Sequence, residues 1–346
     1  MAPNPGLLIA GQQVLAGERK ALALPLGSLY SHMPAELPLQ VICGKRAGPV
    51  LFVSAAVHGD ELNGVEIIRR LLQLPQLQRL RGSLIAAPIV NLYGFLQQSR
   101  YLPDRRDLNR SFPGSAQGSL AARLARMVAQ DILPLVTHGI DLHTGAVHRA
   151  NLPQIRADLD DEVTLAMAKA FGSPVILNSA LRDGSLRATA KDLGIPILVY
   201  EAGEALRFDD ISIRGGVHGI LQVMKHLGML PTKASKPVKD PIMARNSSWQ
   251  RAPRSGVFRS LKKLGQRVQR DELLGYISDP FGTDEQEVRT KVGGIIIGML
   301  YLPLVHEGEA LFHVAQFNRT DLAVERVESY QERLESNQLL DSDFPS

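Results

Sequence analysis

The chain has 346 residues, of which 45% are hydrophobic and 21% charged, a composition typical of a globular protein large enough for two domains. The net charge of +4 is small and the basic residues lack interleaved aromatic residues, so we expect no nucleic-acid partner. A single cysteine, Cys43, excludes an intrachain disulfide. No signal-peptide pattern opens the chain, and no apolar run approaches the roughly 18 residues that span a bilayer. We therefore expect a cytoplasmic enzyme or binding protein without a membrane partner.

The first part of the chain predicts strands that lead into a helix. Residues 1–50 alternate apolar and polar stretches with Gly and Pro breaks, which predicts antiparallel strands. Residues 51–57 are apolar or small and predict a buried strand. The polar break HGDE at 58–61 follows, and residues 62–72 then have the periodicity of an amphipathic helix. Polar residues at the carboxyl end of such a strand lie where α/β proteins bind ligands.

His58 and Glu61 stand three residues apart in this break. Both can project to one side where the helix begins, so an imidazole and a carboxylate could share one metal ion. His306 and Glu309 repeat the spacing, so the pair alone is not specific, and a capped helix start is the alternative. Further ligands elsewhere in the chain are needed to indicate a metal site.

A second buried strand is predicted at 83–90, followed by a long loop at 91–114 with little periodicity. Arginine is suited to bidentate recognition of carboxylates, so the loop is either an anion-binding segment or a solvated charged loop. Its polar candidates lie within eleven residues: Arg100, Arg105, Arg106, Asn109 and Arg110.

Two further strands, at 137–143 and 195–200, end at His143 and at Glu201. Helices are predicted before, between and after them, at 119–133, 160–171, 185–193 and 211–227. Three strand ends thus finish in His58 and Glu61, in His143, and in Glu201. Two His and one Glu suit a catalytic zinc that keeps one position open for water. A fourth carboxylate nearby could take the proton from that water.

The remainder changes character. Residues 231–254 are rich in Pro, Lys and Ser and predict a connector, which divides the chain into domains at 1–230 and 255–346. Two similar pieces, at 261–277 and 300–315, each place a turn before an apolar strand pair, which predicts a small β-sandwich with internal pseudo-symmetry. A helical segment near 325–339 forms the tail.

Five motifs together resemble the succinylglutamate desuccinylase/aspartoacylase family of zinc carboxypeptidase-like (M14-type) hydrolases. They are HGDE at 58–61, RY at 100–101, DLNRSFPG at 107–114, DLHTG at 141–145 and EAG at 201–203. The resemblance implies an α/β fold with a mixed central sheet flanked by helices, and a small all-β, barrel-sandwich-like domain at the C-terminus. The C-terminal part lacks the Met-Lys-Met tip of biotinyl carriers, so we expect it to shield the active site or to support assembly.

The resemblance also implies roles for individual residues. The ligands of one zinc ion fall on His58, Glu61 and His143, and the general base falls on Glu201. Glu204 is the competitor for the base, although its position beyond Gly203 favours a cap or surface role.

The pair that binds the substrate carboxylate falls on Asn109 and Arg110. The arginine that polarises the scissile carbonyl falls on Arg100, with Arg106 as the competitor. Asp141 is expected to orient a ligand. Arg149–Arg156 either contacts substrate or forms a surface loop.

We therefore predict a zinc-dependent amidohydrolase that cleaves an N-acyl amino acid or a related small carboxylated amide. The alternatives are a metallocarboxypeptidase that acts on peptide C-termini and a non-catalytic binding protein of the same fold. A homo-oligomer is compatible with these predictions.

Overall fold

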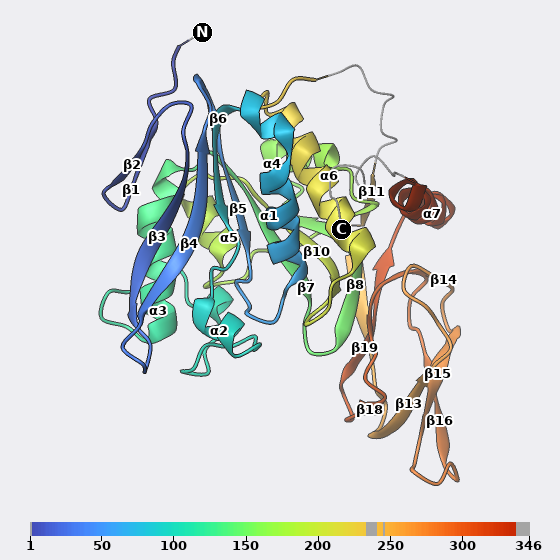
Figure 1. Ribbon diagram of the computed structural model, residues 1–346. Coiled ribbons are helices and arrows are strands. Elements are labelled where there is room, and N and C mark those ends of the chain that lie inside the picture. Colours follow the sequence, from blue (N-terminus) through green and yellow to red (C-terminus); the bar gives the residue numbers. More distant parts are fainter. Residues whose placement is uncertain (1, 233–240, 245, 337–346) are drawn as a thin grey trace.

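The computed structural model describes residues 2–232, 241–244 and 246–336. Within them, a 13-stranded mixed sheet forms the centre of the molecule (Figure 1). Its longest path runs in the order β12-β19-β17-β8-β10-β7-β5-β6-β4-β3. The strands from the first two thirds of the chain are β3 (Arg19–Ser28), β4 (Pro34–Cys43), β5 (Arg46–Ala55), β6 (Arg81–Ala87), β7 (His138–Gly145), β8 (Arg149–Ala157), β9 (Val175–Asn178) and β10 (Ile197–Glu204).

Parallel pairing joins the strands that carry the predicted ligands. β5 pairs in parallel with β6 and with β7, and β7 pairs in parallel with β10. β3 and β4 form an antiparallel hairpin, as predicted for the N-terminal region, and β4 continues antiparallel onto β6. A separate two-stranded sheet precedes them, formed by β1 (Leu7–Ile9) and β2 (Gln12–Val14).

Helices cover both faces of the sheet, because strand residues alternate between two cores. Leu51 and Val53 of β5 face a core shared with α1 (Asn63–Gln73), α4 (Glu162–Phe171) and α6 (Asp210–His226). Phe52 faces the opposite core, with α3 (Leu120–Met127) and α5 (Leu186–Asp192). The predicted helix at 119–133 is α3 continued by a π-turn (Val128–Ile132) and a 3₁₀ turn (Leu133–Leu135). Shorter elements are η1 (Pro75–Arg79), α2 (Leu92–Leu96) and η2 (Leu108–Arg110).

Strand β8 corrects one alternative, since residues 149–157 are not a surface loop. β8 is largely buried and pairs antiparallel with β10. Its other edge pairs antiparallel with β17 (Gly294–Leu300), which comes from the C-terminal part of the chain. The C-terminal strands therefore extend the central sheet.

No helix among the described residues is long and apolar enough to cross a membrane.

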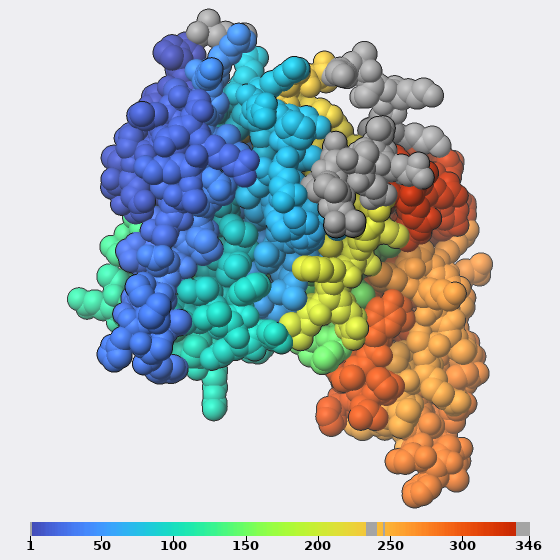
Figure 2. Space-filling model, in the orientation of Figure 1, coloured from blue at the N-terminus to red at the C-terminus, as the bar shows by residue number. Residues whose placement is uncertain are grey.

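The C-terminal part forms a sandwich-like lobe, in orange in Figure 2. Its four-stranded antiparallel sheet, β16-β15-β13-β18, packs on β17 and β19 through a core that includes Phe258, Ile277 and Phe312. Each of the two similar sequence pieces has one strand after its turn, β15 in the first and β19 in the second. The elements are β11 (Ile242–Ala244), β12 (Asn246–Arg251), β13 (Gly256–Ser260), β14 (Arg267–Val268), β15 (Leu273–Ser278), β16 (Glu285–Arg289), β18 (Leu304–Val305), β19 (Ala310–Gln316) and α7 (Thr320–Ser336).

These elements bear out the predicted fold class, a mixed α/β sheet with a small C-terminal β-unit. The predicted connector lies partly outside the described residues, at 233–240 and 245. Its described remainder includes β11, which pairs with β9, and β12, which pairs with β19. The last residues of the predicted tail helix, 337–339, also lie outside the described residues. The domain boundaries stay a prediction.

His313 on β19 makes stability depend on pH. Burial, reinforced by the positive charge of Arg156, lowers the pKa of His313 to about 3. An unfolded chain takes up this proton near pH 6.5, so the free energy of unfolding falls as pH drops below that value. Between pH 7 and pH 5 the loss from this group is about 2 kcal/mol.

We expect His313→Phe, which keeps an aromatic ring, to lose less stability than the wild type between pH 7 and pH 5. Urea denaturation at the two pH values measures the difference, with the exposed His306→Gln as the control. An equal loss in wild type and His313→Phe would contradict the assignment.

Candidate metal centre and active site

The turn between β5 and α1 carries two of the predicted ligands. β5 ends at Ala55, and the backbone folds back so that the Glu61 amide donates to the His58 carbonyl at 3.2 Å. Gly59 is required here, because a Cβ at this position would stand 1.9 Å from the carbonyl carbon of Gly94. The turn is thus pressed against α2, and both side chains point into the interior.

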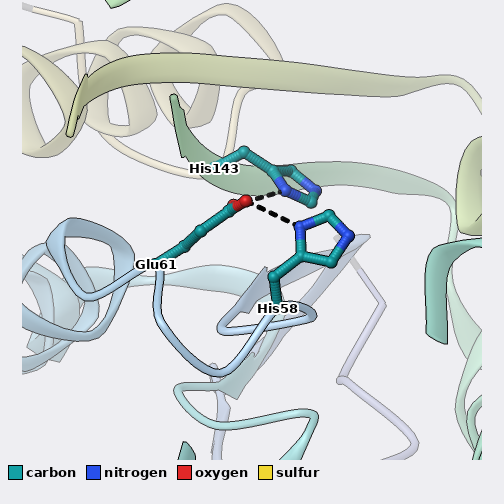
Figure 3. Close-up of side chains that lie close together, drawn as sticks. All are labelled: His58, Glu61 and His143. Carbon is teal, nitrogen blue, oxygen red and sulfur yellow. Dashed lines mark hydrogen bonds and ion pairs between the residues drawn. The ribbon is translucent and has the colours of Figure 1, made fainter. Parts of the chain in front are cut away.

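His143 on β7 joins His58 and Glu61 in one buried cluster (Figure 3). The Glu61 carboxylate lies between the imidazoles, with Oε1 2.7 Å from His58 Nδ1 and Oε2 2.7 Å from His143 Nδ1. One ligand atom from each of the three residues lies within 4.8 Å of the others. Two imidazole nitrogens and a carboxylate converging from buried positions form a donor set suited to a divalent metal.

Each imidazole is held from behind by a second carboxylate. His143 Nε2 lies 2.7 Å from Asp141 Oδ2, and the other oxygen of Asp141 accepts from the Ser54 hydroxyl. His58 Nε2 lies 3.1 Å from Asp107 Oδ1. This carboxylate–histidine arrangement fixes ring orientation in metal sites, and it leaves both Nδ1 atoms facing the centre. Asp107 was not among the predicted site residues, although it is the first residue of the DLNRSFPG motif at 107–114.

The electrostatics of the cluster match a site built for a cation. Burial alone would lower the pKa of His143, but the carboxylates of Asp141 and Glu61 raise it well above its usual value. Burial alone would raise the pKa of Glu61, but His58 and His143 hold it well below its usual value. Protons on the imidazoles thus balance the carboxylates, and a metal ion would replace these protons.

Arg100 lies against the same cluster. One guanidinium nitrogen stands 3.3 Å from Glu61 Oε1 and 3.2 Å from His58 Nδ1, and the other donates to Asp107 Oδ2 at 2.9 Å. The positive end of this side chain therefore reaches the cluster of His58, Glu61 and His143. Arg106, the competing arginine, is exposed, and among the described residues it does not line the cavity that His58, Glu61 and His143 line.

Glu201 on β10 lies beside the buried cluster because β10 and β7 are parallel neighbours and Glu201 is in register with His143. Its Oε2 accepts a hydrogen bond from Asn151 Nδ2 at 2.7 Å, and its Oε1 lies 3.6 Å from Arg156 Nε. Both neighbours come from β8. Glu204, the competing carboxylate, pairs with Arg207 at 3.3 Å and does not line the cavity among the described residues.

All seven predicted site residues line a single cavity of about 230 Å³. Asn109 and Arg110 sit in the turn η2, where the Asp107 side chain accepts from the Asn109 amide. The Asn109 carboxamide oxygen is used by the Leu186 amide, which anchors the turn to α5. The lining also includes residues that the sequence did not single out, chiefly Arg182, Arg187 and Trp249.

The cavity is strongly positive. Arg182 and Arg187 both have a lowered pKa, caused first by burial and then by repulsion from neighbouring arginines. The acidic residues in the lining are Glu61, Asp141 and Glu201, against six arginines: Arg100, Arg110, Arg149, Arg156, Arg182 and Arg187. Such a cavity favours anionic ligands.

Comparison with known proteins decides the family. Residues 47–227 match the succinylglutamate desuccinylase/aspartoacylase catalytic domain, which is more than half of the chain. The chain belongs to this family. The predicted family and the predicted class of activity, amide hydrolysis by a metal-dependent deacylase, are thereby confirmed.

Relatives extend over most of the chain. It is 24% identical to the N-alpha-acetyl-L-2,4-diaminobutyric acid deacetylase of Halomonas elongata, over 85% of this chain and 90% of that protein. A succinylglutamate desuccinylase/aspartoacylase structure from Rhodobacter sphaeroides is 28% identical, with a TM-score of 0.77, and covers 87% of this chain and 95% of that one. The product-bound ectoine utilization protein EutE (DoeB) of Ruegeria pomeroyi is 25% identical, with a TM-score of 0.77, 86% of this chain and 94% of that one being covered.

Proposed function

We propose that this family member is a zinc-dependent deacylase. Its substrate would be a small N-acyl amino acid that carries a net negative charge. The observation that carries the proposal is the position of Glu201, whose carboxylate lines the same cavity as the buried cluster of His58, Glu61 and His143. The Halomonas relative, a deacetylase of an N-acetylated amino acid, supports an N-acyl amino acid as the substrate; the anionic character is inferred from the arginines of the cavity. The two-His, one-Glu donor set favours zinc, with one ion per chain.

The residues of the chain divide the chemistry among them. A zinc ion bound by His58, Glu61 and His143 would supply Lewis acidity and lower the pKa of a water molecule. Glu201, which lines the same cavity, would accept the proton of the attacking water and pass it to the leaving amine. Arg100, which lies beside Glu61, would donate to the carbonyl oxygen as negative charge develops on it.

Asn109 and Arg110 are the proposed site for the carboxylate of the amino acid. The Arg110 side chain is exposed toward the cavity and hydrogen-bonds to the backbone carbonyl of Asn109. A charge-assisted hydrogen bond contributes about 1.5–3 kcal/mol, and this contribution is present in the bound substrate as well as in the transition state. Its loss therefore weakens binding more than turnover.

We expect Arg110→Gln to raise KM for the best carboxylated substrate about ten- to a hundredfold with a small change in kcat. Steady-state kinetics measure both constants, and Arg106→Gln, an arginine of the same loop outside the cavity, is the control. An unchanged KM in Arg110→Gln would argue against this carboxylate site.

The experiment that tests the proposed function is amine release by the zinc-loaded protein across a panel of N-acyl amino acids and short peptides. The panel pairs each acidic substrate with its neutral amide counterpart, such as N-acetylglutamate with N-acetylglutamine. Release from acyl amino acids, with the acidic member preferred, would support the proposal. Release from peptides alone would favour a carboxypeptidase, and a protein that binds no zinc and releases no amine would be a binding protein.

A further inference from the structure

We propose that Trp249 forms the wall of the cavity that receives the acyl group and limits its length. The inference rests on the proposed function, because it assumes an N-acyl amino acid in the cavity. Trp249 is the single tryptophan of the chain and lies on β12, beyond the residues that match the family's catalytic domain. Selectivity for the acyl group would thus come from the C-terminal part of the molecule.

The position of Trp249 is fixed by a row of residues across four neighbouring strands. Trp249 is in register with His313 on β19, which is in register with Gly298 on β17, and Gly298 is in register with Asn151 on β8. Residues in register on adjacent strands share a face of the sheet. Gly298 places no side chain between His313 and Asn151; a Cβ there would stand 3.0 Å from Asn151 Oδ1.

The indole is also held by its neighbours, so it can act as a fixed wall. The rings of Trp249 and His313 are stacked, with centroids 4.5 Å apart and an interplanar angle of 9°. The guanidinium of Arg149 lies 5.8 Å from the indole centroid. Arg149 is itself fixed, since its Nε donates to the Ala310 carbonyl at 3.1 Å and a terminal nitrogen lies 3.6 Å from Glu309.

The order of groups along β8 indicates which part of the substrate faces Trp249. Glu201 contacts both Asn151 and Arg156, so it lies between the two ends of the strand. At the Arg156 end, the Ser179 amide donates to the Ala157 carbonyl at 3.0 Å, and Arg187 donates to the Ser179 carbonyl at 3.0 Å. Leu186, next to Arg187, donates its amide to the Asn109 side chain at 2.9 Å. The proposed carboxylate site thus lies toward one end of β8 and Trp249 toward the other.

A substrate placed in this cavity has its scissile carbonyl beside Glu201 and its amino-acid carboxylate at the Arg110 end. Its acyl group must then extend in the opposite direction, toward Trp249. The other side chains of the lining are charged, polar or no larger than valine, so the indole is the large apolar surface available to an acyl chain among the described residues. A bulky side chain there leaves room for a short acyl group only.

The test compares acyl selectivity in Trp249→Ala and in the wild type. The substrates are the N-acetyl, N-butanoyl and N-hexanoyl derivatives of the amino acid that the wild type hydrolyses best. We expect kcat/KM of the wild type to fall at least tenfold from the acetyl to the hexanoyl substrate. In Trp249→Ala, the ratio of kcat/KM for hexanoyl to kcat/KM for acetyl should be at least tenfold higher than in the wild type. Trp249→Phe, which keeps a ring against His313, should show a smaller recovery. Phe281→Ala, an exposed aromatic residue of the same lobe, is the control and should match the wild type.

A second readout does not depend on turnover. Because Trp249 is the only tryptophan, the tryptophan emission of the protein reports on this residue alone. Addition of the N-acetyl and N-butanoyl amino acids to zinc-loaded Glu201→Gln protein should shift this emission, and the longer acyl group should shift it more.

The outcomes separate the two proposals. If the wild type hydrolyses no N-acyl amino acid, the proposed function is wrong and the inference falls with it. If the wild type is active, an unchanged acyl profile in both Trp249→Ala and Trp249→Phe overturns the inference alone. A change in amino-acid preference in place of acyl preference would also overturn it, because Trp249 would then lie at the other end of the substrate.

Discussion

Replacing Glu201 by glutamine is expected to lower kcat about 10²–10⁴-fold, because a positioned general base contributes a factor of this size. The glutamine keeps the shape of the side chain and can still hydrogen-bond to Asn151, which holds Glu201 at 2.7 Å in the wild type. It cannot accept a proton from water. Because Glu201 is not one of the three clustered ligand residues, the variant should retain its metal. Turnover of the preferred substrate and metal content after dialysis measure the two effects.

Glu204→Gln is the matched control for this substitution. Glu204 lies on the same strand and its side chain is buried to nearly the same extent, 14% exposed against 15% for Glu201. It pairs with Arg207 and lies outside the lining of the cavity. Its loss should therefore leave turnover nearly unchanged. Comparable losses in the two variants, or full activity in Glu201→Gln, would remove Glu201 from the role of base.

The sequence predicted the centre of the site because the relevant information is local. A strand, a polar break and an amphipathic helix can each be identified from a short window, as at His58 and Glu61. Parallel strands that end at one edge bring their terminal residues together, so His143 and Glu201 needed no further information once the strand ends were identified. The observed pairing, β5 with β7 and β7 with β10, is the arrangement that this argument requires.

The residues that surround the centre were harder to predict, because they depend on pairing between distant segments. β8 has no regular alternation: a register shift opposite β10, between Glu201 and Gly203, brings Asn151 to the same face as Arg156. Its other edge is covered by β17, more than 130 residues later, which explains why a segment with two arginines is largely buried. Trp249 falls in the predicted connector, where composition suggested a linker although the segment pairs with β19.

Replacing Glu61 by glutamine should have a larger effect than replacing Glu201, since the Glu61 carboxylate contacts both imidazoles of the cluster at 2.7 Å. A carboxamide offers the metal one neutral oxygen, and the negative charge that compensates a divalent cation is lost. In the metal-free wild type, burial would lower the pKa of His58, but Glu61 and Asp107 raise it. Metal binding by the wild type should therefore release protons, and the affinity for the metal should rise with pH.

We expect Glu61→Gln to lose its zinc on dialysis and its turnover to fall to background, with wild-type protein in chelator as the reference for complete loss. Readdition of zinc should restore the chelated wild type and not the variant. Glu66→Gln is the matched control, because Glu66 lies close by in the chain, in the first turn of α1, and pairs with Arg69 and Arg70 instead of the imidazoles. This control should retain zinc and turnover. Stoichiometric zinc and normal turnover in Glu61→Gln would mean that the buried cluster is a structural ion-pair network and that the metal binds elsewhere.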